Sequence, residues 1–413
     1  MENIKDKANL CLNCPARFCA ENGCPVHTNI PEFISCVKSD EYEKAYNILM
    51  DNNIFSHICS IVCPQYEQCE GACIRQKMGS PTEIGKLEEF VNNWALENGV
   101  AYEKAKKESN GKRVAIVGSG PSSLECAYEL LVEGYSVDIY EKESFAGGLL
   151  SYGIPDFRLT KDLVKEVVDR IEKNGAKFFF EKELGKDILL EDLSKEYDAV
   201  YIGIGAPRSS KYKLSEETFG IIDAYDLIKK YYKGEKLEAL GNVIVIGGGN
   251  VAMDCSRIAL KMGAKSSKIL YRRDKAHMPA NPIELEGALS DGVEFHELVR
   301  VDSANLENGK MVSVNCVKTE IVNDKAQDKE PKEEFLVDAD NVIFAIGMKP
   351  NKDFIASIGI ETDEWGYIKV DEDGKTNLDN VYAGGDVIEY KYTVARAIAS
   401  GKKAAKGIIK NIK

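Results

Sequence analysis

The chain has 413 residues, enough for two or three domains that each bury a core. Hydrophobic residues make up 44% and charged residues 29% of it, a composition typical of a folded globular protein. The formal net charge of −13 disfavours nucleic acid and anionic membranes as partners, and no apolar run is long enough for a membrane-spanning helix. MENIKDKANL, at the start, has no apolar signal segment, so we expect a cytoplasmic protein whose thiols stay reduced.

Twelve cysteines are spread unevenly, and most of them precede residue 74. Four lie in CLNCPARFCAENGC (residues 11–24) and three in CPQYEQCEGAC (residues 63–73). In a reducing compartment, such a density of cysteines indicates metal binding more often than structural disulfides. Thiolates at these intervals can surround an iron–sulfur cluster, because the turns between them present backbone N–H groups to the sulfide.

Two other uses of the cysteines stay open. Structural zinc sites usually employ paired C-x2-C motifs, and only Cys11 and Cys14 form one. A redox disulfide would need a close cysteine pair inside a nucleotide-binding module, whereas Cys126 and Cys255 are single and are expected to pack within their helices. An iron–sulfur centre explains the cysteine pattern better than either alternative.

The segment between the two cysteine groups predicts a small helical domain. IPEFISCVKSDEYEKAYNILMDNN (residues 30–53) has apolar residues at helical spacing. A charged stretch, LENGVAYEKAKKESNGK (residues 96–112), is expected to be helical as well. The pattern changes at KRVAIVGSG to an apolar strand and a glycine turn, so we expect a domain boundary near residue 110.

Two similar strand–turn–helix segments follow, at residues 114–142 and 242–273. This repetition predicts an α/β fold with two Rossmann-like dinucleotide-binding domains. An apolar strand follows each segment, YDAVYIGIG and then DNVIFAIG, and the chain closes on NVYAGGD. The simplest arrangement inserts the second domain into the first, which resumes near residue 335.

The first glycine loop, GSGPSS (residues 118–123), predicts a pyrophosphate site at the start of the following helix. Ser123 stands where a third glycine is usual, and it is small enough for close helix packing. Glu141 ends the next strand, where an acid usually accepts hydrogen bonds from a ribose. The candidate nucleotide-contacting residues in the loop are Gly118, Gly120, Pro121 and Ser122.

The second glycine loop, GGGNVA (residues 247–252), has the same pattern with Ala252 in the third position. Its second strand ends in Arg272 and Arg273 rather than in an acid. Guanidinium groups can bind a 2′-phosphate, so this domain is expected to prefer NADPH to NADH, unless the arginines are merely solvated. The candidate residues in the loop are Gly247, Gly249, Asn250 and Val251.

Two nucleotide domains in one chain suggest a flavin and a nicotinamide, because hydride must pass between two different carriers. Gly385 and Asp386, after the strand-like VYA, would suit the flavin, so the first domain is expected to bind FAD. The expected domains are a helical iron–sulfur domain (1–110), the FAD domain in two parts (111–235 and 335–413) and an NADPH domain (236–334).

The chain as a whole resembles the small subunit of NADPH-dependent glutamate synthase. The resemblance lies in CLNCPARFCAENGCPVHTNIPEF, CPQYEQCEGAC, GSGPSSLECAYEL, FAGGLLSYGIPDFRL, GGGNVAMDC, YRRDKAHMPA and VYAGGD, in this order. The same module is similar to the N-terminal part of dihydropyrimidine dehydrogenase and to the large subunit of the electron-bifurcating NADH-dependent ferredoxin:NADP oxidoreductase. The resemblance implies FAD, NADPH and two [4Fe–4S] clusters.

The resemblance also implies which residues hold these groups. One cluster would use Cys11, Cys14, Cys19 and Cys73, and the other Cys24, Cys63 and Cys69. An eighth ligand sixteen residues past the last cysteine would be Glu89, with Cys59 as a rival. Gly147 and Gly148 would let the loop at residues 145–158 lie against the flavin. His57 and His296 are read as packing or surface residues, and His277 follows the arginines without a required role.

We therefore expect an enzyme that passes hydride from NADPH to FAD and single electrons through the clusters to a partner. Hydride transfer needs positioning rather than a catalytic acid, so no catalytic side chain is assigned. The partner would be the large subunit of glutamate synthase. The alternatives are a large subunit of the bifurcating oxidoreductase, with a small flavoprotein subunit and ferredoxin, a freestanding NADPH oxidoreductase, or a non-enzymatic assembly module.

Overall fold

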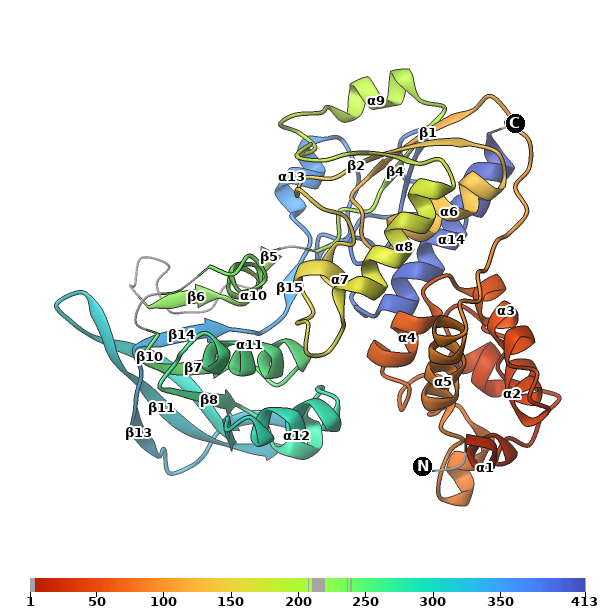
Figure 1. Cartoon of the computed structure of the whole chain (residues 1–413). Helices are drawn as coiled ribbons and strands as arrows, with labels where there is room; N and C mark the ends of the chain where they lie inside the picture. Colours follow the sequence, from red (N-terminus) through yellow and green to blue (C-terminus); the bar gives the residue numbers. More distant parts are fainter. Residues whose placement is uncertain (1–3, 207, 210–219, 236, 238–239, 413) are drawn as a thin grey trace. The chain divides into compact units, whose positions relative to one another are not determined.

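The structure, a computed structural model, is shown in Figure 1 and describes residues 4–206, 208–209, 220–235, 237 and 240–412. The chain divides into two compact units. The first contains residues 1–151, 156–206 and 350–413, and the second contains residues 152–155 and 207–349. None of the helices in the described ranges is both long and apolar enough to cross a membrane.

Short helices form the beginning of the first unit, here called the helical module (residues 4–100). The helices predicted within residues 30–53 are confirmed, and their buried residues recur at three- and four-residue spacing. Pro31 lies in the first turn of its helix, where a backbone N–H is not needed. The helices of the module are α1 (Ile4–Asn9), α2 (Ile30–Lys38), α3 (Tyr42–Asn52), α4 (Ser56–Val62) and α5 (Ile84–Glu97).

The charged stretch at residues 96–112 is not helical beyond Glu97, contrary to the prediction from the sequence. α5 ends at Glu97, Gly99 has a φ of 65°, and residues 101–110 contain no helix. This stretch lacks an apolar face that could pack on a neighbour, so local propensity alone does not hold it as a helix. Its backbone bonds to a later part of the first unit instead, with the N–H of Lys107 donating to the carbonyl of Val132 at 2.8 Å.

The first unit continues with a parallel sheet of strand order β16-β4-β1-β2-β3. β16 comes from near the end of the chain, so the chain returns to this sheet after the second unit. The strands are β1 (Arg113–Val117), β2 (Ser136–Tyr140), β3 (Lys177–Phe179), β4 (Ala199–Ile202) and β16 (Val381–Ala383). The helices are α6 (Pro121–Val132), α7 (Leu149–Tyr152), α8 (Lys161–Lys173), α9 (Leu190–Glu196), α13 (Lys352–Ser357) and α14 (Val394–Asn411).

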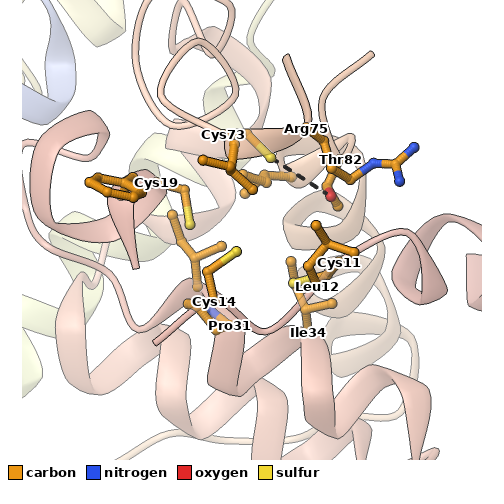
Figure 2. Close-up of a pocket in the computed structure, with 13 residues that line it drawn as sticks. Cys11, Leu12, Cys14, Cys19, Pro31, Ile34, Cys73, Arg75 and Thr82 are labelled. Carbon is orange, nitrogen blue, oxygen red and sulfur yellow. Dashed lines mark hydrogen bonds between the residues drawn. The ribbon is translucent and has the colours of Figure 1, made fainter. Parts of the chain in front are cut away.

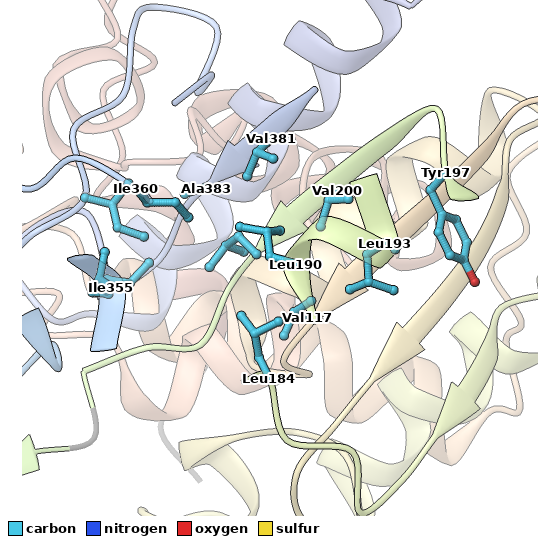
Figure 3. Close-up of a cluster of buried hydrophobic side chains, with 14 residues drawn as sticks. Val117, Leu184, Leu190, Leu193, Tyr197, Val200, Ile355, Ile360, Val381 and Ala383 are labelled. Atoms are coloured by element: carbon cyan, nitrogen blue, oxygen red, sulfur yellow. The ribbon is translucent and has the colours of Figure 1, made fainter. Parts of the chain in front are cut away.

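A buried apolar cluster, shown in Figure 3, covers one face of this sheet. Val117, Val200 and Val381 come from three neighbouring strands, and alternate residues of each strand point to the same face. Leu193 of α9 and Ile355 of α13 pack against them. Full burial of each such aliphatic side chain contributes about 1.5 to 3 kcal/mol, so the cluster fixes the strand ends that carry the first glycine loop.

The second unit has its own parallel sheet, of order β6-β14-β7-β8-β9. It extends beyond the expected NADPH domain (236–334) at both ends, because β6 and β14 pair with each other and β14 pairs with β7. The strands are β6 (Ile221–Asp223), β7 (Asn242–Ile246), β8 (Ser266–Tyr271), β9 (Glu294–Glu297) and β14 (Asn341–Phe344). The helices are α10 (Ala224–Tyr232), α11 (Asn250–Lys261) and α12 (Pro282–Ser290).

Antiparallel strands complete the second unit. A long strand, β11, pairs with β10 along one edge and with β12 and β13 along the other. A short ladder joins β5 to β15. Buried residues such as Val301 and Cys316 pack this sheet onto the parallel sheet. These strands are β5 (Arg208–Ser209), β10 (Val299–Glu307), β11 (Lys310–Val322), β12 (Lys325–Asp328), β13 (Glu334–Asp338) and β15 (Met348–Lys349).

Candidate cofactor sites

The first candidate site is a hollow in the helical module that opens to solvent, here called the first cavity. Its lining contains four of the predicted ligands, Cys11, Cys14, Cys19 and Cys73. Figure 2 shows these side chains around a common space. Asn13 and Arg17, with φ values of 48° and 40°, turn the chain sharply between the thiols. The tertiary fold therefore brings Cys73 to three cysteines that lie more than fifty residues earlier.

A second such hollow, here called the second cavity, holds the other predicted cysteines. Its donor groups are Cys24, Cys63 and Cys69, joined by Cys59 and Glu88. Ile30 and Ile84 line both cavities, so the two are neighbours. Ala395 of α14 also lines the second cavity, which places this cavity beside α14.

The structure does not place Glu89 at either cavity. Glu88 lines the second cavity instead. Both residues lie on α5, whose buried face carries Ile84, Leu87 and Val91. Glu88 follows Ile84 by four residues and shares this face, whereas Glu89 is turned by about 100° around the helix. The helical spacing of the apolar residues was a sequence signal that distinguishes the two glutamates.

Burial shapes the electrostatics of the second cavity. The Oγ of Ser56 donates to Oε1 of Glu88 at 2.8 Å, and Nδ2 of Asn92 donates to the Oγ of Ser56 at 3.0 Å. Burial raises the pKa of Glu88 to about 7, although the bond from Ser56 lowers it. Burial likewise raises the pKa of Cys24 and of Cys69. A bound cation reverses such shifts, because metal ligands ionise when they coordinate.

The donor groups suit a multi-atom group better than a single ion. Among the described residues, no three His, Cys, Asp or Glu side chains converge closely enough to hold one metal ion. The donors surround an open space in each cavity instead. A [4Fe–4S] cluster takes one donor per iron, so its ligands stand on four sides of it. The donor chemistry of the two cavities therefore fits iron–sulfur ligation.

The first glycine loop joins β1 to α6. Gly118 has a φ of 92°, and a Cβ there would overlap the carbonyl oxygen of Gly203. Gly120 stands at the N-cap of α6, and a Cβ there would enter open space. Ser123 is fully buried, and a Cβ added to Gly203 would overlap its Oγ. This close approach explains why the third position of the loop needs a small residue.

Glu141 holds this loop in place. Its carboxylate is 3% exposed and accepts hydrogen bonds from the N–H and the Oγ of Ser119, at 2.9 and 2.6 Å. The N–H of Glu143 donates to its other oxygen at 2.9 Å. A carboxylate has about four acceptor positions, so a ribose hydroxyl can still bind. The sequence had indicated the ribose contact but not the bonds to Ser119.

The segment predicted to lie against the flavin packs on the same loop. The N–H of Gly147 donates to the carbonyl of Ser119 at 3.0 Å. Gly148 has a φ of 55°, and a Cβ there would lie 2.8 Å from the Cα of Gly120. Only glycine fits both the backbone conformation and this approach. The open space beside Gly120 is therefore bordered by Gly147 and Gly148.

Gly385 and Asp386 reach this region from β16. Gly385 has a φ of 80°, and its N–H donates to the Oγ of Ser400 at 2.7 Å. The Oγ of Ser400 lies 3.3 Å from the Oγ of Ser122 in the first loop. Burial raises the pKa of Asp386 to about 7. The structure thus gathers Ser122, Gly385 and the glycines of the first loop at the carboxyl end of one sheet, where dinucleotides bind in such folds.

The second glycine loop has the same form in the second unit. Gly247 has a φ of 150°, and a Cβ there would overlap the carbonyl oxygen of Ala345. Gly249 stands at the N-cap of α11, and a Cβ there would enter open space. Oδ1 of Asn250 accepts from the N–H of Asn281 at 2.8 Å. Val251 follows in the first turn of α11 and is partly exposed.

The two arginines after β8 differ in their surroundings. Arg272 is exposed, and its guanidinium forms no ion pair with any residue that the structure describes. Arg273 is half-buried, and its Nη2 donates to the carbonyl of Asp324 at 2.9 Å. Nδ1 of the nearby His277 lies 2.5 Å from Oδ1 of Asp274. Arg272 is therefore the better placed of the two to bind a phosphate.

The remaining cysteines and histidines take no part in either cavity. Cys126 and Cys255 are fully buried in α6 and α11, as expected from their spacing. Burial raises the pKa of both thiols, which disfavours a reactive thiolate. Nε2 of His296 lies 3.4 Å from Oε2 of Glu294, at the surface, and His57 is partly buried on α4.

Two protein families match this chain. Residues 112–405 match the family described as pyridine nucleotide-disulphide oxidoreductase. Residues 1–100 match the family described as dihydropyrimidine dehydrogenase domain II, 4Fe-4S cluster. The two matches meet in the linker between α5 and β1.

Two related proteins come from Escherichia coli (strain K12). AegA is 36% identical over 99% of this chain, which spans 65% of the length of AegA. The glutamate synthase [NADPH] small chain is 33% identical over 98% of this chain, which spans 90% of that small chain. This chain thus covers less than two thirds of one relative and most of the other.

A solved structure shares the fold. FprA from Mycobacterium tuberculosis, in complex with NADPH, has a TM-score of 0.62 and is 20% identical in sequence. The match covers 73% of this chain and 84% of FprA. At this identity the likeness shows the fold, and the expected α/β class with Rossmann-like domains is confirmed.

Proposed function

The chain belongs to the pyridine nucleotide-disulphide oxidoreductases and, among them, to the family of the glutamate synthase small chain, and on that premise we propose that it is an NADPH:acceptor oxidoreductase with FAD and two [4Fe–4S] clusters. The observation that carries the proposal is the pair of neighbouring donor-lined cavities, the second of which adjoins α14. When bound, the flavin exchanges hydride for single electrons and the clusters carry those electrons one at a time.

The cluster ligands follow from the two cavities. In the first cavity the ligands would be Cys11, Cys14, Cys19 and Cys73. In the second they would be Cys24, Cys63, Cys69 and Glu88. Cys59 also lines the second cavity, but its Sγ accepts a hydrogen bond from Nδ2 of Asn53 at 3.3 Å. Such a bond does not exclude Cys59, and Glu88 also accepts one from Ser56 at a single oxygen. We favour Glu88 because its carboxylate is buried in the cavity and has a second oxygen to offer, and Cys59 stays the alternative.

The nucleotide sites follow from the two loops. Gly120 would leave room for the pyrophosphate of FAD, and Gly385 and Asp386 would contact its ribitol. Gly249 would leave room for the pyrophosphate of NADPH, and Arg272 would bind its 2′-phosphate. A helix N-terminus favours the negative phosphates in both cases, because its first N–H groups have no partner within the helix.

The acceptor is expected to dock over the first cavity. Leu12 and Phe18 line this cavity and are 53% and 44% exposed. Cys63 and Cys69 of the second cavity are only 7% and 8% exposed. Exposed large apolar side chains beside a candidate redox site favour a protein partner there. The first cavity therefore faces the acceptor, and the second lies between it and the flavin side.

The proposed partner is the large subunit of a glutamate synthase. In support, this chain spans 90% of a glutamate synthase small chain. A small flavoprotein subunit with ferredoxin, or a transient acceptor, would make the protein a bifurcating or a freestanding oxidoreductase instead. Mass spectrometry of the proteins that co-purify under strict anaerobiosis separates the three cases.

The cofactors are tested on the anaerobically purified protein. We expect one FAD and two clusters' worth of iron and sulfide per chain, and rapid bleaching of the flavin by NADPH. Glu88→Ala should alter the electron paramagnetic resonance spectrum of one reduced cluster, whereas the matched control Glu89→Ala should leave it unchanged. Iron for a single cluster, or no bleaching by NADPH, would contradict the proposal.

A further inference from the structure

A buried ionic cluster joins α6 and α14 of the first unit to the helical module. Glu125 and Glu129 lie on α6, and Lys402 lies on α14. Nζ of Lys402 is 3.2 Å from Oε1 of Glu125 and 3.4 Å from Oε1 of Glu129. The same ammonium donates a hydrogen bond to the carbonyl oxygen of Asn52, at the end of α3. Three helices from distant parts of the sequence therefore meet at one lysine.

The two carboxylates direct Lys402. Glu125 is 1% exposed, and its oxygens accept no hydrogen bond from any described residue, so the ion pair with Lys402 is its main compensation. Lys104 lies 4.0 Å from Glu129 and balances the second acid. Burial lowers the pKa of Lys402, but Glu125 and Glu129 raise it by more. The lysine is therefore charged and held between α6 and α3.

Asn52 and Asn53 connect this lysine to the second cavity. Oδ1 of Asn52 accepts from the N–H of Asn29 at 3.1 Å, at the start of the helix that follows Cys24. Asn53 lines the second cavity, and its Nδ2 donates to the Sγ of Cys59 at 3.3 Å. A cation at the last carbonyl of a helix is favourable. Lys402 thus holds the turn that forms one wall of the cavity.

The same helix, α14, contacts the first glycine loop. A Cβ at Gly401 would overlap the carbonyl oxygen of Ser122, so α14 and α6 are in close contact beside Lys402. At the start of α14, the Oγ1 of Thr393 accepts a hydrogen bond from Nε2 of Gln68 at 3.2 Å. Gln68 lines the second cavity. α14 is therefore in contact both with the loop expected to bind FAD and with the wall of the second cavity.

We propose that Lys402 is a positioning residue that fixes the Asn52–Asn53 wall of the second cavity relative to the flavin-binding loop, and that Glu125 and Glu129 direct its ammonium to that wall. This inference rests on the proposed function for its redox consequence. Its structural part, the attachment of the Asn52 turn to α14, stands without any cofactor.

The test uses a double variant, because Lys402→Met alone leaves a buried carboxylate without compensation and is expected to destabilise the fold. At pH 8, above the pKa of about 7 that burial gives Glu125, Lys402→Met combined with Glu125→Gln removes both charges. Lys406→Met, at an exposed position of the same helix, is the matched control. Lys402→Arg, which keeps the charge and the donor, is the rescue variant.

Hydrogen exchange of the turn is the first measurement. The N–H groups of Asn53 and Ser56 donate to the carbonyls of Leu49 and Asn53, so they are protected in the native protein. Loss of one charge-assisted bond should speed their exchange roughly ten- to a hundredfold in the double variant. Lys402→Arg and Lys406→Met should exchange like the wild type. Wild-type protection in the double variant would overturn the proposal.

The reduction potential of the clusters is the second measurement. We expect the double variant to keep full iron and sulfide content while the potential of one cluster shifts, and Lys402→Arg to restore it. An unchanged potential with an intact turn would refute the role of Lys402. Absence of iron and sulfide from the wild-type protein would instead refute the proposed function, and the exchange measurement would still decide the attachment of the turn.

Discussion

The two glycine loops occupy equivalent places in their sheets but are held by different side chains. The N–H of Gly118 donates to the carbonyl of Tyr140, and the N–H of Gly247 donates to the carbonyl of Leu270. In this register the counterpart of Glu141 is a tyrosine, Tyr271, and not an arginine. Glu141 bonds to Ser119, whereas the ring of Tyr271 occupies the space that a Cβ at Gly248 would need.

This difference shows how one loop geometry can serve two ligands. In the first unit an acid organises the loop and stays within reach of a ribose. In the second unit an aromatic ring takes the place of the acid, and Arg272 follows it at the surface. The helices preserve a further equivalence, since Glu125 and Asp254 each lie five residues after the last glycine of their loop and are 1% and 2% exposed. The four predictions that follow test how far the equivalence extends.

The largest effect is expected where both loops are most constrained. Gly118→Ala and Gly247→Ala each place a Cβ onto a backbone carbonyl at a positive φ. Strain and overpacking together should lower the free energy of unfolding by about 4 kcal/mol. Thermal melting of the apoprotein measures it. If one variant melts like the wild type, the two loops are not equivalent.

Glu125 should make stability fall as pH rises. Burial raises the pKa of Glu125 to about 7 in the folded protein, above its usual value of 4.5, while Lys402 lowers it and Glu129 raises it. The folded state therefore keeps a proton that the unfolded state loses, and stability declines between about pH 4.5 and 7. The difference corresponds to about 3 kcal/mol, and Lys104 also faces the group and favours its ionised form.

Glu125→Gln should reduce this decline but not abolish it, because the pKa values of Glu88 and Asp386 are also raised to about 7. We expect the variant to gain stability relative to the wild type as the pH is raised from 5 to 8, measured by thermal melting across that range. Glu129→Gln, on the same helix but partly exposed, is the control. A difference in melting temperature between the variant and the wild type that stays constant from pH 5 to 8 would show that Glu125 is ionised throughout.

Arg272→Ala should separate the two nicotinamide nucleotides. A charge-assisted bond to phosphate contributes about 1.5 to 3 kcal/mol, so KM for NADPH should rise roughly ten- to a hundredfold while KM for NADH changes little. Arg273→Ala should have the smaller effect, because Arg273 is already bonded to the carbonyl of Asp324. Equal losses for both nucleotides would show that neither arginine binds the phosphate.

The smallest effect on stability is expected at Gly120 and Gly249. A Cβ at either position enters open space, so alanine should leave the melting temperature of the apoprotein nearly unchanged. The same Cβ would crowd a bound pyrophosphate, and we expect at least about a tenfold loss of affinity, near 1.4 kcal/mol. Gly120→Ala should affect FAD alone and Gly249→Ala NADPH alone, as equilibrium binding of each nucleotide would show. A loss of both ligands in one variant would contradict the assignment of the two loops.

The sequence determined the local features of this protein. Local patterns predicted the strand–glycine–helix segments and the helices of residues 30–53, because hydrophobic periodicity and the conformational freedom of glycine act over a few residues. The two cysteine groups are visible in the sequence itself. The prediction of a helix in the charged stretch at residues 96–112 was wrong, because a charge pattern alone does not supply the packing that a helix needs.

Only the tertiary structure decided which distant residues meet. The resemblance had implied which cysteines share each cavity, and helical spacing separates Glu88 from Glu89, but only the structure gave Tyr271 the position in the second unit that Glu141 has in the first. Lys402 contacts Asn52, 350 residues away in the chain. Such contacts depend on how whole helices and strands pack, and no spacing within a short segment encodes them.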